Sequence, residues 1–294
     1  MANYYANSFV YPRELTRQGN YCFDIGAYAD VWCAKDTGTG ETVAIKSWRG
    51  AGFDTKTHQK FVDCLNRELT IWSGLSHPNV VQFKGVVPDF GHLPALVMPF
   101  YQRRSVIKYI RENQPTRILD LAIDVACGLT YLHSLQRPID HGDLKGSNIL
   151  VDDDGRALIC DFGLNNLVGG ADFNFTTANV AGSCRWMAPE VMKPSDTPAV
   201  ENESGLYTST KSDVYSFGMT VLEMFTAEKP FAHLHNDAAV ILATIGGRRP
   251  NRPTAEKAPQ LTDEIWEVIE SCWAQDPDQR PTMDMVGKWL QSCI

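Results

Sequence analysis

The sequence predicts an α+β fold with two unequal lobes, a small β-rich lobe followed by a larger, mainly α-helical one. Strand-like runs cover 20–48, 80–87 and 93–100, and a single helical stripe lies between the first and the second of them. After residue 100, apolar residues recur with a helical period. The chain has 294 residues, 44% of them hydrophobic, which is enough to build a sizeable core in each part.

The small lobe is predicted to begin with a hairpin and to contain one helix. Alternating runs on either side of the T-G-T-G turn at 37–40 predict two paired strands within 20–48. Two further strand-like runs cover 80–87 and 93–100. Between the hairpin and these runs, one apolar stripe at helical spacing indicates an amphipathic helix. The stripe consists of Phe61, Leu65, Leu69 and Trp72, with Glu68 beside it.

The second part is predicted to contain at least four helices. A 3.6-residue apolar stripe predicts a buried helix over 117–135, and the segment 211–226, apolar on most faces, predicts a central helix. Thr262 is suited to cap a helix that ends near residue 273, and the last helix is expected to start near Thr282. The segment 193–210, rich in Pro, Ser, Thr and Glu, is predicted to be a surface loop.

Composition excludes several classes of function. The net charge of −8 has the wrong sign for a general nucleic-acid or anionic-membrane binder. The eight cysteines are scattered without a C-x-x-C pair, which predicts reduced thiols in an intracellular, cytoplasmic protein. The first ten residues lack the features of a signal peptide, and no uncharged apolar run approaches the roughly 20 residues of a membrane span.

Three oxygen-bearing side chains are expected to converge within the segment 139–163. Asp143 and Asn148 lie in a predicted loop, and Asp161 follows a short apolar strand, a D-D-D-G turn and a second apolar strand. A hairpin of these strands would return Asp161 to the side of the other two residues. Such a group of oxygens suits Mg²⁺, which combines few protein ligands with phosphate oxygens.

This arrangement resembles the catalytic loop and D-F-G segment of eukaryotic protein kinases, in which H-R-D-x-x-x-x-N precedes D-F-G. V-A-I-K at 43–46 extends the resemblance, and G-S-C-R-W-M-A-P-E at 182–190 is similar to the tyrosine-kinase-like group of Ser/Thr kinases. The resemblance implies the bilobal protein-kinase fold. It divides the chain into a lead-in at 1–16 and a kinase domain at 17–291, with an N-lobe of about 17–98 and a C-lobe of about 102–291.

The resemblance also assigns roles in phosphoryl transfer. Asp143 is expected to be the catalytic base, and Asn148 and Asp161 are expected to hold Mg²⁺. Lys145, two residues after Asp143, is within reach of the γ-phosphate and in this family marks selectivity for Ser and Thr.

On the nucleotide side, Lys46 of V-A-I-K is expected to bind the α- and β-phosphates of ATP and to pair with Glu68 of the following helix. Met98 falls at the gatekeeper position of the lobe connector, and the next residues of the connector offer backbone groups to adenine. The complete set expected to bind ATP is Gly26, Val31, Ala44, Lys46, Met98, Phe100, Tyr101 and Leu150.

Two departures from the family pattern predict altered behaviour. The phosphate-covering loop reads D-I-G-A-Y-A-D-V, so that only Gly26 remains of three glycines and Asp24 occupies the first glycine position. A carboxylate there repels the triphosphate unless it points outward, and we therefore expect weakened ATP binding.

Gly142 replaces the usual arginine of the catalytic loop, which predicts activity without strict dependence on phosphorylation of 161–190. Candidate phosphorylation sites there are Thr176, Thr177 and Ser183.

The resemblance assigns structural roles to other residues. His141 is expected to pack beneath Phe162, with its backbone tied to Asp213. Glu190 and Arg280 are expected to form a buried ion pair that braces the large lobe. Trp72 and Phe83 are expected to belong to a hydrophobic column through Phe162 and His141.

Three functions compete. The first is an active Ser/Thr kinase with Ser/Thr-bearing protein substrates; no nucleic-acid or membrane partner is expected, and no oligomeric state is predicted. The second is a pseudokinase scaffold, which the altered glycine loop and Gly142 favour. The third is a small-molecule kinase, which the A-P-E segment disfavours because it resembles a protein-substrate platform.

Overall fold

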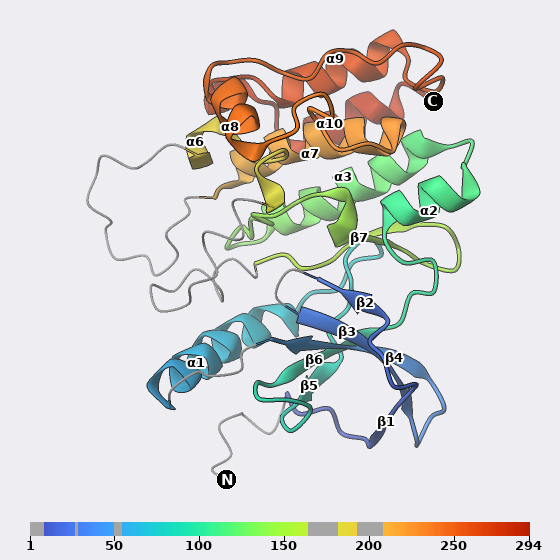
Figure 1. Cartoon of the computed structure of the whole chain (residues 1–294), viewed down its shortest axis with the longest axis vertical. Helices are drawn as coiled ribbons and strands as arrows, with labels where there is room; N and C mark the ends of the chain where they lie inside the picture. The colour runs from blue at the N-terminus through green and yellow to red at the C-terminus, as the bar shows by residue number, and fades with distance from the viewer. Residues whose placement is uncertain (1–8, 27–28, 50–54, 164–181, 193–207) are drawn as a thin grey trace.

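The computed structural model describes residues 9–26, 29–49, 55–163, 182–192 and 208–294. It has the bilobal protein-kinase fold predicted from the sequence, with a β-rich lobe at the bottom of Figure 1 and a helical lobe above it. Tyr28, Thr176, Thr177 and most of the predicted loop at 193–210 lie outside the described residues.

The small lobe is an antiparallel sheet in the order β1-β3-β4-β6-β5, with β2 paired to β3. Helix α1 (Thr55–Trp72) lies beside it and carries the predicted apolar stripe into the core. The predicted hairpin is formed by β3 and β4. The strands are β1 (Leu15–Arg17), β2 (Asp24–Ile25), β3 (Ala29–Asp36), β4 (Thr42–Trp48), β5 (Gly85–Val87) and β6 (Ala95–Pro99).

The strand expected over 80–87 is shorter than predicted. Only Gly85–Val87 joins the small-lobe sheet. The N–H of Val81 instead donates to the carbonyl of Ile159 at 2.9 Å, and the N–H of Ile159 donates to the carbonyl of Asn79 at the same distance. The first part of the predicted strand therefore pairs with the large lobe, a long-range contact that alternation of residues does not reveal.

Residues 9–11 add to the small-lobe sheet beside β5. Val10 forms a parallel bridge with Val86, and the hydroxyl of Tyr11 donates to Asp36 at 2.7 Å. Gly85 permits this close approach, because a Cβ at that position would lie 3.0 Å from the Cα of Tyr11. The segment before β1 is thus anchored at two points of the sheet.

The large lobe is built around α7 (Thr210–Thr226), whose residues are buried on nearly all sides as the sequence predicted. The predicted cap at Thr262 is confirmed, since its side chain accepts from the N–H of Ile265 in α9. The last helix starts at Met283, as predicted, and Thr282 caps it by accepting from the N–H of Met285. A small hairpin of β7 (Ile149–Val151) and β8 (Ala157–Ile159) faces the other lobe. The remaining helices are α2 (Val106–Asn113), α3 (Ile118–Ser134), α6 (Pro189–Met192), α8 (Asp237–Ile245), α9 (Asp263–Cys272) and α10 (Met283–Gln291).

The predicted ion pair of the large lobe is present. Arg280 is 2% exposed and donates two parallel hydrogen bonds to Glu190, at 2.6 and 2.8 Å. It also donates to the carbonyls of Ala274 and Lys211. The pair joins α6 to the segment before α10. Within the described segments, no helix combines the length and apolar character needed to span a membrane.

Candidate active site

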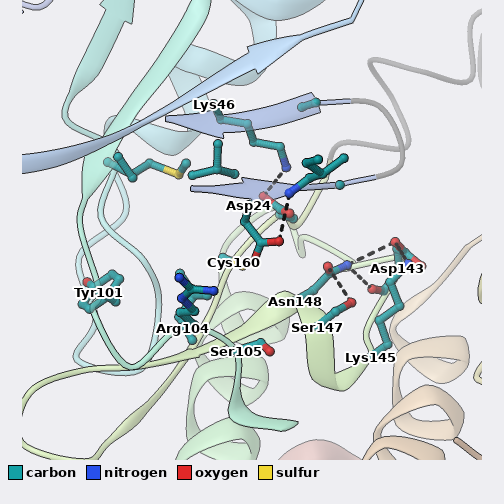
Figure 2. A pocket seen from close by; sticks show the side chains of 18 of the residues that line it. Asp24, Lys46, Tyr101, Arg104, Ser105, Asp143, Lys145, Ser147, Asn148 and Cys160 are labelled. Atoms are coloured by element: carbon teal, nitrogen blue, oxygen red, sulfur yellow. Dashed lines mark hydrogen bonds and ion pairs between the residues drawn. The ribbon is translucent and has the colours of Figure 1, made fainter. Parts of the chain in front are cut away.

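A cleft of about 510 Å³ opens between the sheet and the helical lobe, and both lobes line it. Figure 2 shows Lys46 projecting from the sheet, with Asp143, Lys145 and Asn148 across the cleft. Every residue predicted for the site lines this cleft except Glu68. These lining residues are Gly26, Val31, Ala44, Lys46, Met98, Phe100, Tyr101, Asp143, Lys145, Asn148, Leu150 and Asp161.

The β7–β8 hairpin brings the predicted oxygen ligands together. Its register pairs Ile149 with Ile159, and the N–H of Cys160 donates to the carbonyl of Asn148 at 3.0 Å. Asp161, the next residue, therefore lies beside the catalytic loop. Its φ of +64° is unusual for a residue other than glycine, and such backbone conformations are concentrated at functional sites.

Hydrogen bonds fix the side chain of Asp143 in the cleft. Lys145 Nζ donates to Asp143 Oδ2 at 2.8 Å, and Asn148 Nδ2 donates to the same oxygen at 3.1 Å and to the Asp143 carbonyl at 2.8 Å. These contacts appear as dashed lines in Figure 2. Among the residues that the structure describes, these bonds engage Oδ2 and the carbonyl of Asp143, so that Oδ1 is left to accept a proton from a ligand.

Ser183 belongs to this network. Lys145 Nζ donates to Ser183 Oγ at 2.7 Å, and Ser183 is only 7% exposed. This burial and hydrogen bond argue against Ser183 as a phosphorylation site, because its hydroxyl would have to leave Lys145 to reach another kinase. Ser183 was proposed as a phosphorylation site because of its place in the 182–190 segment. The sequence did not show that this segment contacts Lys145.

Lys46 forms its ion pair with Asp161, Nζ to Oδ1 at 2.6 Å. Glu68 lies at the C-terminal end of α1. A Cβ added to Gly163 would lie 3.2 Å from Oε2 of Glu68, which places this carboxylate against the glycine of D-F-G. The structure thus brings Glu68 to the D-F-G segment behind the cleft, and its pairing with Lys46 stays a prediction.

Two carboxylates of α7 accept hydrogen bonds from the backbone of the catalytic loop. Asp213 accepts from the backbone N–H groups of His141 and Gly142 at 2.7 and 2.9 Å, which confirms the predicted tie to His141. Glu223 accepts from the N–H of Gly146 and from Nε1 of Trp186, each at 2.9 Å. Sequence analysis missed Glu223, because no local pattern distinguishes it from the other residues of an apolar helix.

The aromatic column is present where it was expected. The ring of Trp72 lies 6.5 Å from that of Phe83 and 6.3 Å from that of Phe162, centroid to centroid. His141 is almost fully buried, and its carbonyl accepts from the N–H of Gly163 at 3.4 Å. This burial and this backbone contact favour a structural role for His141, whose packing beneath Phe162 stays a prediction.

The residues present fit Mg²⁺ bound together with a nucleotide. Asn148 and Asp161 offer side-chain oxygens. Asn148 donates its amide nitrogen to Asp143, and its Oδ1 accepts from Ser147 Oγ at 3.3 Å while keeping a second lone pair for a ligand. In the described part of the chain no cluster of three or more His, Cys, Asp or Glu side chains forms a metal cage. Mg²⁺ suits such a partial site, because it retains water and phosphate ligands.

Asp24 faces the cleft. It is exposed and lines the cleft, and its Oδ1 accepts from the N–H of Ile25 at 2.9 Å. Figure 2 shows it on the cleft side of the strands, below Lys46. The negative charge thus lies on the surface that would cover a triphosphate, where it opposes binding.

Removing this charge is expected to strengthen nucleotide binding. We expect Asp24→Asn to lower the Kd for Mg·ATP about threefold to tenfold, with a smaller gain at high salt because exposed charges are screened. Isothermal calorimetry at two ionic strengths measures this. Asp30→Asn is the matched control, because Asp30 lies on β3 and pairs with Arg49 instead of lining the cleft. Equal Kd values for Asp24→Asn and the wild type would contradict the repulsion.

Burial raises the pKa of Glu223 to about 7. The folded protein therefore retains a proton that the unfolded chain loses near the ordinary carboxyl pKa of about 4.3. The contribution of Glu223 to the free energy of unfolding is therefore fully present below about pH 4.3, the pKa of this carboxyl in the unfolded chain. It is lost as the pH rises through about 7.

Glu223→Gln keeps an acceptor oxygen but does not ionise. We expect it to reduce the loss of unfolding free energy between pH 5 and pH 8, by on the order of 2 kcal/mol. Urea unfolding at both pH values checks this, with Glu270→Gln on the exposed side of α9 as the control. An identical pH dependence for the wild type and Glu223→Gln would refute it.

Comparison with known proteins gives consistent matches over nearly the whole chain. Residues 22–290 match the family model described as protein tyrosine and serine/threonine kinase. The serine/threonine-protein kinase CTR1 of Arabidopsis thaliana is 33% identical over 285 residues, which cover 90% of this chain and 32% of the relative. TNNI3K of Mus musculus is 34% identical over 275 residues, covering 92% and 30%. Serine/threonine-protein kinase 12 of Arabidopsis thaliana is 32% identical over 291 residues, covering 97% and 56%. The chain spans about a third of the length of the first two relatives.

Proposed function

The chain belongs to the protein tyrosine and serine/threonine kinase family, and from this membership we propose that it transfers the γ-phosphate of ATP to serine and threonine hydroxyls of protein substrates. The observation that carries the proposal is the convergence of Lys46, Asp143, Lys145, Asn148 and Asp161 in one cleft. Turn-forming aspartates without a catalytic role would not need to meet a strand lysine and a loop asparagine across two lobes.

Each residue has a defined task in the proposed reaction. The substrate hydroxyl oxygen attacks the γ-phosphorus, the bond from that phosphorus to the bridging oxygen breaks, and ADP leaves. Asp143 Oδ1 accepts the hydroxyl proton, while Lys145, already 2.8 Å from Asp143 Oδ2, offsets negative charge on the transferred group. Lys46 binds the α- and β-phosphates. Asn148 and Asp161 would hold Mg²⁺, which supplies charge neutralisation at the phosphates.

Selectivity for Ser and Thr is supported by the surroundings of Lys145. Its ammonium joins Asp143 to Ser183, at 2.8 and 2.7 Å, and so links the expected base to the 182–190 segment. The relatives described above carry the name serine/threonine-protein kinase.

The cellular setting and partners follow from charge and cysteine chemistry. All eight cysteines are free, which supports a reducing, intracellular compartment. The net charge of −8 argues against nucleic acid as a partner. We infer that the partners are protein substrates, because the chain belongs to a family of protein kinases.

A pseudokinase scaffold is the second candidate, because Asp24 faces the phosphate side of the cleft and only one glycine of the phosphate-covering loop remains. The two functions are separated by incubating the protein with Mg·ATP labelled at the γ-phosphate and pools of Ser, Thr and Tyr peptides. We expect label on Ser and Thr peptides and none on Tyr peptides. Detectable Mg·ATP binding without label on peptides or protein would support the scaffold and refute the kinase.

A further inference from the structure

We propose that Phe23 and Arg104 form a clasp that closes the outer end of the nucleotide cleft, and that Arg104 is a nucleotide-positioning residue. This inference rests on the proposed function, because it concerns the same cleft. Neither residue was predicted for the site from sequence, and nothing in the motif spacing points to them.

The clasp is a stack of three side chains. The Arg104 Cζ atom lies 4.0 Å from the centroid of the Phe23 ring, and that ring meets Phe100 edge-on with 4.7 Å between centroids. All three residues line the cleft. Phe23 directly precedes β2 in the small lobe, whereas Phe100 and Arg104 belong to the connector after β6. The stack therefore ties the base of the phosphate-covering loop to the connector between the lobes.

The backbone of Arg104 indicates that its side chain has a function. Its φ is +62°, a conformation that glycine adopts freely and larger residues adopt rarely. Hydrogen bonds fix the backbone there, because the N–H of Arg104 donates to the Tyr101 carbonyl at 3.2 Å and its carbonyl accepts from Val151 at 3.0 Å. Such conformations are found often at functional sites, and Arg104 combines one with a position in the lining of the cleft.

The guanidinium of Arg104 is available to the cleft. Among the residues that the structure describes, no carboxylate or carbonyl pairs with it, whereas the neighbouring Arg103 donates to the Asp153 carbonyl at 2.8 Å. Figure 2 shows Arg104 on the side of Tyr101 and Ser105, away from Asp143 and Lys145. It thus lies at the nucleoside end of the cleft instead of the phosphate-transfer end.

The clasp compensates for the altered glycine loop. With a single glycine, the loop has less backbone freedom to fold down over a nucleotide. Stacking of Phe23 between Arg104 and Phe100 holds the loop base over the cleft before a ligand arrives, and preorganisation of this kind lowers the cost of binding. Because the clasp acts at the nucleoside end, it should contribute equally to binding of adenosine and of ATP.

Calorimetry with adenosine and with Mg·ATP tests the clasp. We expect Arg104→Gly and Phe23→Leu each to weaken both probes about threefold to thirtyfold, the range of a partly desolvated cation–aromatic contact. The double variant should lose no more than either single variant, because both break one unit. Arg104→Gly should keep the wild-type Tm, since glycine suits the backbone. Arg103→Ala, whose side chain does not line the cleft, should stay within twofold.

Several outcomes would overturn the clasp. Affinities of Arg104→Gly within twofold of the wild type for both probes would do so. A loss confined to Mg·ATP would also do so, because it would indicate a charge contact with phosphates. Additive losses in the double variant would show that the two residues act separately. If the wild-type protein binds neither adenosine nor Mg·ATP, the proposed nucleotide site is refuted. The wild type is measured first, so this failure is distinguished from a failure of the clasp.

Discussion

Replacing Asp143 with asparagine is expected to lower kcat for peptide phosphorylation about 10²–10⁴-fold, the range of general-base catalysis. The amide cannot accept the hydroxyl proton, whereas its oxygen can still accept from Lys145 or Asn148, which hold the carboxylate at 2.8 and 3.1 Å. We therefore expect the Kd for Mg·ATP to change less than threefold, because the loss is confined to the chemical step.

Steady-state kinetics with a Ser peptide, together with calorimetry on the same samples, measures this separation. Asp154→Asn is the matched control, because Asp154 lies in the turn of the same hairpin and pairs with exposed Arg156. The control should retain wild-type kcat. An Asp143→Asn variant with near wild-type kcat would remove Asp143 from the chemistry, and one that lost Mg·ATP binding would make it a binding residue.

Replacing Glu190 with alanine is expected to lower the free energy of unfolding by about 3–5 kcal/mol. The substitution leaves the guanidinium of Arg280, which is 2% exposed, without its carboxylate. Two carbonyl acceptors remain, but they supply no compensating charge. The expected loss arises because the guanidinium of Arg280 remains shielded from water after the carboxylate of Glu190 has been removed.

Urea unfolding of Glu190→Ala and Glu190→Gln separates charge from hydrogen bonding. The glutamine variant retains one acceptor and should lose less than the alanine variant. Asp284→Ala is the control, because Asp284 forms an exposed pair with Lys288 on α10, at 2.7 Å. Such pairs contribute about 0–1 kcal/mol. Similar losses for Glu190→Ala and Asp284→Ala would show that burial does not strengthen the Arg280 pair.

The convergence of three oxygen-bearing side chains was predictable because a local segment of the chain determines it. Asp143, Asn148 and Asp161 are joined by one short hairpin, so that spacing and turn residues alone place them together. The helix cap at Thr262 and the start of the last helix near Thr282 were predictable for the same reason. In both cases, the contacts that position these residues join segments that are close in sequence.

Contacts between distant segments escaped prediction. Glu223 reaches Gly146 across 77 residues, and Lys145 reaches Ser183 across 38. The shortened strand at 80–87 has the same cause, because residues 79–81 pair with β8. Arg104 escaped for a different reason: its left-handed backbone depends on a bond from Val151, and arginine in a sequence gives no sign of a positive φ.

The two carboxylates beneath the catalytic loop also determine how this loop fluctuates. The amides of His141, Gly142 and Gly146 donate to Asp213 and Glu223, on the most deeply buried helix of the large lobe. These amides can exchange their hydrogens with solvent only when the loop detaches from α7. Detachment breaks these three hydrogen bonds to buried groups, and we therefore expect the amides to exchange more slowly than those of the exposed loops. A segment with only one short 3-10 turn, Gly146–Asn148, is thus expected to exchange slowly because a buried helix holds its amides.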